Sequence, residues 1–107
     1  MVLKVFGVYD LKAKCFSQPF FSVSTGAAIR AFSDAVNDKS VPFNKHPGDY
    51  QLFEIGSFDD GVGKLSSVVP SVLLGSASDF VVDVAVAGFP VLNDSVLKEV
   101  SNGSKKG

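Results

Sequence analysis

The segment HPGDYQLFEIGSF, residues 46–58, gathers the residue types that could carry out chemistry. It holds the single histidine of the chain, His46, together with Asp49, Glu54 and three aromatic residues. A metal site would need more histidine or cysteine ligands at a recognised spacing, and Cys15 is the only cysteine. Nucleophilic catalysis would need a base paired with the nucleophile, and no such pair is evident. We therefore predict no catalytic residue, no metal ligand and no cofactor.

Two further segments resemble motifs of binding or catalytic sites, but each lacks the residues or the spacing that its motif requires. GVGKLS, residues 61–66, resembles a phosphate-binding loop, but Phe58 stands where the first glycine belongs and Leu65 replaces the Ser or Thr that would hold magnesium. Asp59 and Asp60 are adjacent, so an extended chain would point them to opposite faces rather than across a substrate. We interpret both segments as parts of one turn, His46 as a loop residue and Cys15 as a packed strand residue.

Charge is nearly balanced over the whole chain but is unevenly distributed. Residues 1–45 hold six basic and three acidic side chains, whereas residues 46–100 hold two basic and eight acidic ones. Non-specific binding to nucleic acid would need a larger positive excess, so any affinity for nucleic acid should be modest and sensitive to salt. The two halves could also attract each other in a head-to-tail contact between copies.

The composition indicates a protein of the cytoplasm. Cys15 cannot form an internal disulfide, and MVLKVFGVYD at the N-terminus lacks the apolar core and cleavage site of a signal peptide. The long uncharged and apolar stretch at residues 65–78 is shorter than the roughly 20 apolar residues that span a bilayer and contains Pro70. We expect no membrane partner.

The first half of the chain predicts a hairpin followed by a helix. Residues 4–10 and 15–24 are rich in β-branched and aromatic residues, and Pro19 places the second strand at a sheet edge or gives it a bulge. In residues 24–38, Ile29, Phe32 and Val36 recur at helical spacing behind a Ser24 or Thr25 cap. Prolines, Asn and Gly then make residues 39–49 a connecting loop.

The second half predicts two more strands and a less regular end. Residues 50–58 alternate as a strand, and a glycine-rich turn leads to another at 64–69. The predicted fold is therefore α+β, a β-β-α-β-β arrangement with a small antiparallel or mixed sheet and one main helix. Residues 79–89 would add a strand and residues 93–101 a short helix. We expect one domain over residues 1–100, with a core at about 1–69, an extension at 70–100 and a flexible tail at 101–107.

Alternation along the strands divides the sheet into two faces. One helix can cover only one face, and we predict that Ile29, Phe32 and Val36 pack on the face with the fewest polar residues. That face would hold Val5, Phe21, Val23, Phe53 and Ile55. The other face would then be uncovered and would mix polar with aromatic residues, namely Lys4, Phe6, Gln18, Phe20, Ser22, Tyr50, Leu52 and Glu54.

The predicted uncovered face suggests two partners. Aromatic side chains on a sheet can stack unpaired bases, and nearby lysines can contact phosphates. The candidate residues for binding single-stranded DNA are Lys4, Phe6, Lys12, Lys14 and Phe20. Alternatively, the chain is a homo-oligomer, with a dimer favoured, that assembles through the same face or through the apolar segment 68–92. The weak surrounding charge favours coverage by protein.

The order of several short segments resembles one viral family. KVFGVYDLKA, PFF, GAAIRAFSDAVND and HPGDYQLFEIGSFDDGVGKL follow one another as in the small nonstructural protein of gokushovirus-type microviruses, which are single-stranded DNA phages. The resemblance covers about residues 4–65. It implies a phage-encoded helper in the host cytoplasm, regarded as DNA-binding and associated with production or packaging of the single-stranded genome. It implies no enzyme activity and assigns no functional residue.

Overall fold

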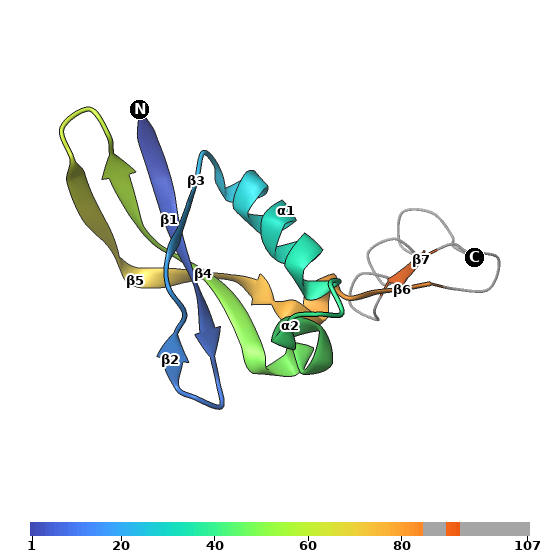
Figure 1. Ribbon diagram of the computed structural model, residues 1–107. Coiled ribbons are helices and arrows are strands. Elements are labelled where there is room, and N and C mark those ends of the chain that lie inside the picture. The colour runs from blue at the N-terminus through green and yellow to red at the C-terminus, as the bar shows by residue number, and fades with distance from the viewer. Residues whose placement is uncertain (85–89, 93–107) are drawn as a thin grey trace.

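A five-stranded antiparallel sheet and one main helix form the larger part of the fold, as Figure 1 shows. The structure is a computed structural model that describes residues 1–84 and 90–92. Its five-stranded sheet has the order β2-β1-β4-β5, with β3 also paired to β1, which confirms the α+β prediction. The elements of this fold are β1 (Val2–Asp10), β2 (Cys15–Phe16), β3 (Phe20–Ser22), α1 (Thr25–Val36), α2 (Pro42–Lys45), η1 (Pro47–Asp49), β4 (Tyr50–Asp59), β5 (Lys64–Ser76) and η2 (Ala77–Phe80).

β2 and β3 pair with the same edge of β1 and act as one interrupted edge strand. Tyr9 pairs with Phe16 in β2, and Phe6 pairs with Phe20 in β3. The interruption spans residues 17–19, where Pro19 has no N–H to donate. Ser17 bridges the gap, because its backbone N–H donates to the carbonyl oxygen of Val8 at 2.8 Å. The predicted hairpin and the edge position of Pro19 are confirmed.

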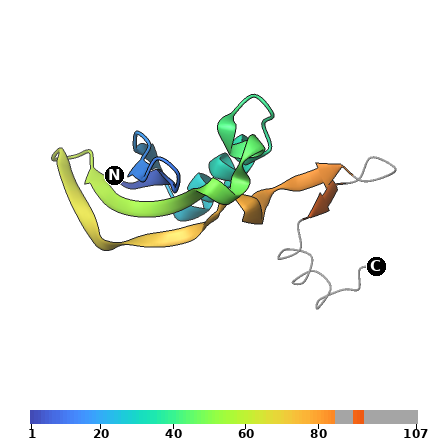
Figure 2. The same cartoon turned by 90° about the horizontal axis from the view of Figure 1, so that it is seen from below.

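α1 begins and ends close to the predicted positions. Ser24 is the N-cap, and its Oγ accepts a hydrogen bond from the backbone N–H of Ala27 at 3.1 Å. Asn37 is the C-cap, and its side-chain amide donates to the carbonyl oxygen of Ser33 at 2.9 Å. The apolar side of this helix lies against one face of the sheet (Figure 1). Figure 2 shows β4 and β5 running together along a curved path that leads to η2.

The sheet is bent by irregular pairing along β4 and β5. In β5 Ser67 pairs with Gly56 and Val72 with Glu54, so residues 68–71 stand opposite Ile55 without a regular partner. Two further register shifts lie between Leu52 and Phe53 in the pairing of β4 with β5, and between Val5 and Phe6 in the pairing of β1 with β4. Extra residues of this kind bend a strand and increase its twist. β5 is also longer than the predicted strand at 64–69, since it continues to Ser76.

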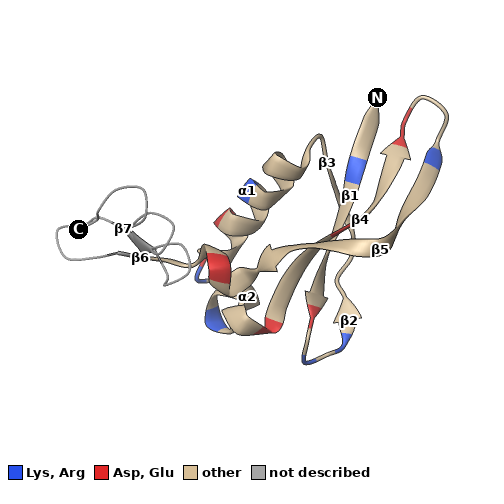
Figure 3. Cartoon of the chain, turned by 180° about the vertical axis from the view of Figure 1, so that it is seen from behind, with Lys and Arg blue, Asp and Glu red and all other residues tan. Residues whose placement is uncertain are grey.

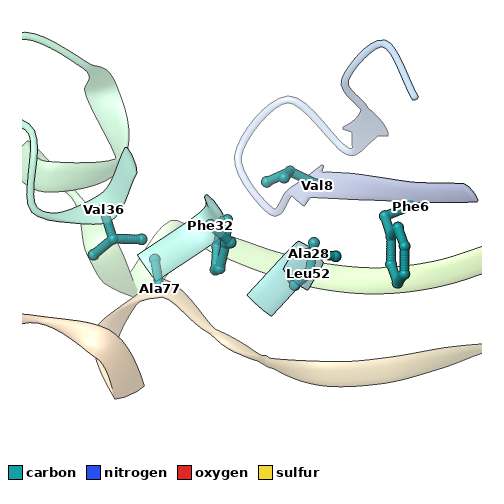
Figure 4. Packing of buried hydrophobic residues seen from close by; sticks show 7 residues of the cluster. All are labelled: Phe6, Val8, Ala28, Phe32, Val36, Leu52 and Ala77. Carbon is teal, nitrogen blue, oxygen red and sulfur yellow. The ribbon is translucent and has the colours of Figure 1, made fainter. Parts of the chain in front are cut away.

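The hydrophobic core lies between α1 and the sheet, as the close-up in Figure 4 shows. Phe6 and Leu52 are fully buried, and Phe32 is 3 % exposed. The Phe32 ring contacts Phe43 and Phe80 at centroid distances of 5.6 and 5.8 Å. The buried cluster comprises Phe6, Val8, Ala28, Phe32, Val36, Leu52 and Ala77. Because Ala77 belongs to it, the core extends beyond residue 69.

The predicted loop 39–49 contains two short helices. α2 places Pro42 in its first turn, where a missing N–H costs nothing, and η1 begins likewise with Pro47. Asn44 ties α2 to α1, because its side-chain amide donates to the carbonyl oxygen of Val36 at 2.9 Å. The prolines are compatible with a helix start, and Asn44 together with the Phe43 ring, which contacts Phe32 and Tyr50, holds these helical turns against the rest of the fold.

Asn37 connects the end of α1 to the segment after η2. Its side-chain nitrogen donates to the carbonyl oxygen of Phe80 at 2.9 Å, and its Oδ1 accepts from the N–H of Val82 at 2.8 Å. β6 (Val82–Val84) and β7 (Pro90–Leu92) then form a separate two-stranded sheet. Of the strand predicted at 79–89, residues 79 and 80 belong to η2 and Val82–Val84 form β6, while residues 85–89 lie outside the described residues. The helix predicted at 93–101 and the tail at 101–107 lie outside the described residues.

The structure corrects the assignment of the sheet faces. Alternation groups the residues as predicted, but α1 packs on the face of Phe6 and Leu52, not on that of Phe53 and Ile55. Lys4 and Glu54 also lie on the helix side, where they form an ion pair: Lys4 Nζ is 3.4 Å from Glu54 Oε2. Thr25 Oγ1, in the first turn of α1, also donates to Glu54 Oε1 at 3.1 Å. A carboxylate near a helix N-terminus is stabilised by the helix dipole.

The sequence predicted no membrane-spanning segment, and the helices of the structure bear on this prediction. Among the residues that the structure describes, no helix is long and apolar enough to cross a membrane.

Candidate binding face

Cross-strand pairing defines the face of the sheet that α1 does not cover, here called the open face. Residues paired across antiparallel strands share a face, so Tyr9 lies with Phe16 and Gln51, and Val5 lies with Phe21. The strand residues of the open face include Leu3, Val5, Gly7, Tyr9, Phe16, Phe21, Gln51, Phe53, Ile55, Gly56, Phe58, Leu65, Ser67 and Leu73.

Three rings form a cluster at the end of the open face nearest the β1–β2 turn. The centroids of Tyr9 and Phe16 are 5.0 Å apart, and those of Phe16 and Phe53 are 5.4 Å apart, both edge to face. Gly7 lies beneath them: a Cβ at this position would come within 3.2 Å of Phe16 Cδ1 and 3.5 Å of Ile55 Cδ1. A glycine here leaves room for the Phe16 ring over the strand.

The opposite end of the open face is aliphatic and aromatic. Phe21 and Phe58 contact each other edge to face at 5.7 Å. Beside them lies a hollow of about 180 Å³, whose lining includes Val5, Ile55 and Leu65. Val5 is buried there by its neighbours although it is not part of the core cluster. The open face is therefore packed within itself, and no further layer of the described residues covers it.

Large apolar side chains on this face are exposed. The exposed fractions are 43 % for Phe16, 50 % for Phe21, 67 % for Leu65 and 52 % for Leu73. None of the open-face residues named above carries a formal charge. Figure 3 agrees with this, since the charged positions of the described chain lie mostly in turns, in helices and at strand ends. The open face is thus an uncharged apolar surface.

The five residues predicted to bind DNA are not brought together. Phe6 is fully buried, so it cannot stack on a base, and Phe20 is half-buried and stacks on Phe6 at 5.6 Å. Lys4 lies on the same covered face and pairs with Glu54. Only Lys12 and Lys14 are exposed, in the turn between β1 and β2.

Asp10 shapes the turn that carries the two exposed lysines. Its Oδ1 accepts hydrogen bonds from the backbone N–H groups of Lys12 and Ala13 at 2.9 and 3.0 Å. Its carbonyl oxygen accepts from the N–H of Lys14 at 2.7 Å. Lys14 has a φ of 58°, in the left-handed region, which is uncommon for a residue other than glycine. The turn therefore presents two cations just before Phe16.

The other chemical candidates occupy surface positions. His46 is exposed and ends α2, and Asp59 Oδ1 accepts from the N–H of Gly61 at 2.9 Å as a turn residue should. Asp60 lies 2.7 Å from the N-terminal amine. Cys15 lies in β2 but is exposed rather than packed. Within the described residues no three His, Cys, Asp or Glu side chains gather as a metal site would need.

A comparison with protein families identifies the chain at a general level. A family model described as Phage ORF5 protein matches residues 3–80, from β1 to η2. The chain belongs to the Phage ORF5 protein family. The matched residues include all five strands of the main sheet, and the prediction of a phage protein is confirmed. Searches of curated proteins and of solved structures found no match.

The open face is the surface that was assigned wrongly from the sequence. Phe16 was not among the candidate residues, and Phe21 and Phe53 were assigned to the core. One signal in the sequence was available: residues 3, 5, 7 and 9 of β1 are all uncharged, and so are residues 51, 53 and 55. Both faces of the sheet are apolar enough to be covered by the helix, so the absence of charge on one face does not show which face the helix covers.

Proposed function

We propose that this member of the Phage ORF5 protein family is an accessory protein that acts by binding, not by catalysis, and that its open face contacts protein. The observation that supports this is an uncharged face with exposed Phe16, Phe21, Leu65 and Leu73. Exposed apolar patches of several hundred Å² commonly mark interaction sites. Phosphate contacts dominate affinity for nucleic acid, and the face itself has no cation to make them.

Growth of the encoding phage tests the proposal. Phe21→Ser and Leu65→Ser remove exposed apolar surface with little expected effect on folding, since neither residue is in the core cluster. The double variant should fold, as monitored by circular dichroism, and reduce phage yield. Val62→Ser is the matched control, because Val62 is exposed in the β4–β5 turn outside this face. Normal yield from a folded double variant would contradict the proposal.

Single-stranded DNA binding is the second candidate function, as expected for a gokushovirus-type nonstructural protein that assists genome production or packaging. Lys12 and Lys14 precede Phe16, whose ring contacts Tyr9 and Phe53. Bases could stack on Phe16 while the lysines contact phosphates, with each stack contributing about 1 to 3 kcal/mol.

Titration with a labelled oligonucleotide at low salt tests this second function. Binding should weaken steeply with salt and should be lost in the double variant Lys12→Ala with Lys14→Ala. Lys39→Ala with Lys45→Ala is the charge-matched control, because these lysines are exposed away from the cluster. Equal loss in both double variants would indicate attraction without a defined site. No binding at tens of micromolar protein would exclude direct DNA binding at a useful affinity.

A further inference from the structure

We propose that the occupant of the open face is a second copy of this chain, packed face to face around a two-fold axis. The inference rests on the proposed function and names its partner. Two copies related by such an axis would form a two-layer β-sandwich, with one α1 on each outer side. Sheets in such sandwiches pack about 10 Å apart through interdigitating side chains.

The absence of charge on the open face supports a second copy. A two-fold contact uses the same patch twice and brings residues near the axis close to their own equivalents. Any charge near the axis would therefore face a like charge, which costs several kcal/mol in an interface. The open-face strand positions avoid this, since none is charged, whereas Lys4, Asp10, Glu54 and Asp59 belong to the opposite parity.

The available area also matches a dimer. Phe16, Phe21, Leu65 and Leu73 together expose roughly 400 Å² of side chain, taking about 200 Å² for each complete side chain. The half-buried residues Leu3, Tyr9, Phe53, Ile55 and Phe58 add to this. A stable interface buries about 800 Å² on each partner, so the open face has the required order of size.

The described part of the single chain buries few hydrophobic residues, so a dimer contact would add substantially to the buried apolar surface. The described chain has eight buried hydrophobic residues, and seven of them form the single cluster under α1. A small domain with one thin core is of marginal stability. Covering the open face would place a second apolar layer on the side of the sheet where, among the described residues, Val5 is the one buried hydrophobic residue.

Sedimentation of the full chain over a range of concentrations tests the inference. The unmodified chain should sediment as a dimer that dissociates on dilution. Phe21→Asp places two carboxylates in the contact and should raise the dissociation constant at least about tenfold. Val62→Asp carries the same substitution on an exposed valine outside the open face and should leave the constant unchanged.

A second variant keeps the test decisive if Phe21→Asp fails to fold. Ser67 is exposed on the open face and pairs with Gly56, so Ser67→Glu adds a charge without removing apolar contacts. It should likewise raise the dissociation constant at least about tenfold. A strict monomer at high micromolar concentration, or a dimer that tolerates Ser67→Glu, would overturn the inference.

The sedimentation and phage experiments fail independently. If the chain is monomeric but the Phe21→Ser and Leu65→Ser variant still reduces phage yield, the face binds a different protein and only the second-copy inference is wrong. If the chain is monomeric and Phe16→Ala abolishes oligonucleotide binding, the face binds DNA and both proposals are wrong.

Discussion

The two faces of the sheet carry similar aromatic and aliphatic side chains, but those of one face are buried beneath α1 and several of those on the other are exposed. On the covered face, Phe6 and Leu52 are buried beneath α1, and the charged pair Lys4–Glu54 lies beside them near the start of that helix. On the open face, Phe16 and Phe21 are exposed and no charge accompanies them. The difference shows that charge does not always mark the solvent side of a sheet, because a helix terminus and a neighbouring lysine can stabilise a carboxylate on the covered side.

Truncating one ring on each side of the sheet, Phe32 of α1 on the covered side and Phe53 of β4 on the open side, gives the largest expected effect. Phe32→Ala should lower the free energy of unfolding by about 4 kcal/mol, because the ring is buried and the cavity would remain. Phe53→Ala should cost only about 2 kcal/mol, since this half-buried ring is exposed on one side. Urea unfolding at low protein concentration measures both. Equal costs would contradict the assignment of the faces.

The bulge that bends β4 provides the second test. A Cβ at Gly56 would collide with the carbonyl oxygen of Ser66, which is backbone and cannot move aside cheaply. Gly56→Ala should therefore destabilise the chain by about 3 kcal/mol.

Gly48→Ala is the control for Gly56→Ala. Nothing lies within 4 Å of a Cβ at Gly48. This variant should unfold at nearly the same urea concentration as the unmodified chain. If both glycines tolerated alanine equally well, the close approach of β4 and β5 at Gly56 would be wrong.

The ionisation of Tyr50 should have the smallest effect on stability of the changes considered. Burial, followed by the nearby carboxylates of Asp10 and Asp49, raises the pKa of Tyr50 above its ordinary value of 10.0. A raised pKa means that folding favours the neutral phenol. The resulting stability is complete below pH 10.0 and is lost as the pH rises through the pKa of the folded state.

The pKa of Tyr50 can be measured in isolation. Tyr9→Phe leaves Tyr50 as the only tyrosine in a chain without tryptophan. The absorbance of this variant at alkaline pH should titrate at a higher pH when folded than in concentrated urea. A folded midpoint equal to or below the unfolded one would contradict the placement of Tyr50 beside Phe43, with ring centroids 4.8 Å apart.

The sequence predicted elements well because local signals determine them. Ser24 caps α1, the spacing of Phe32 and Val36 fixes its buried side, and Pro19 marks the edge strand. The choice of covered face was wrong because it depends on long-range contacts: Glu54 meets Thr25 and Lys4 only after folding. The irregular pairing of residues 68–71 and the link from Asn37 to Phe80 gave no periodic signal at all.

The exposed binding candidates were predictable only in part. Lys12 and Lys14 lie in a turn, and turns are exposed in almost every fold. Phe6 and Phe20 were wrong as binding candidates because the face assignment was wrong: both alternate with open-face residues and therefore lie on the covered face. Phe16 could be found only from the fold, because its position over Gly7 depends on how β2 meets β1.

The central position of β1 affects how the protein is made. β1 is synthesised before the other strands of the sheet, yet its partner β4 lies far along the chain: Lys4 and Glu54 are 50 positions apart. A nascent chain that has reached only α1 therefore has β1 and its edge strands without their neighbour, and closing so long a loop is slow. During that interval the apolar residues of both sheet faces are accessible to chaperones and to other nascent chains.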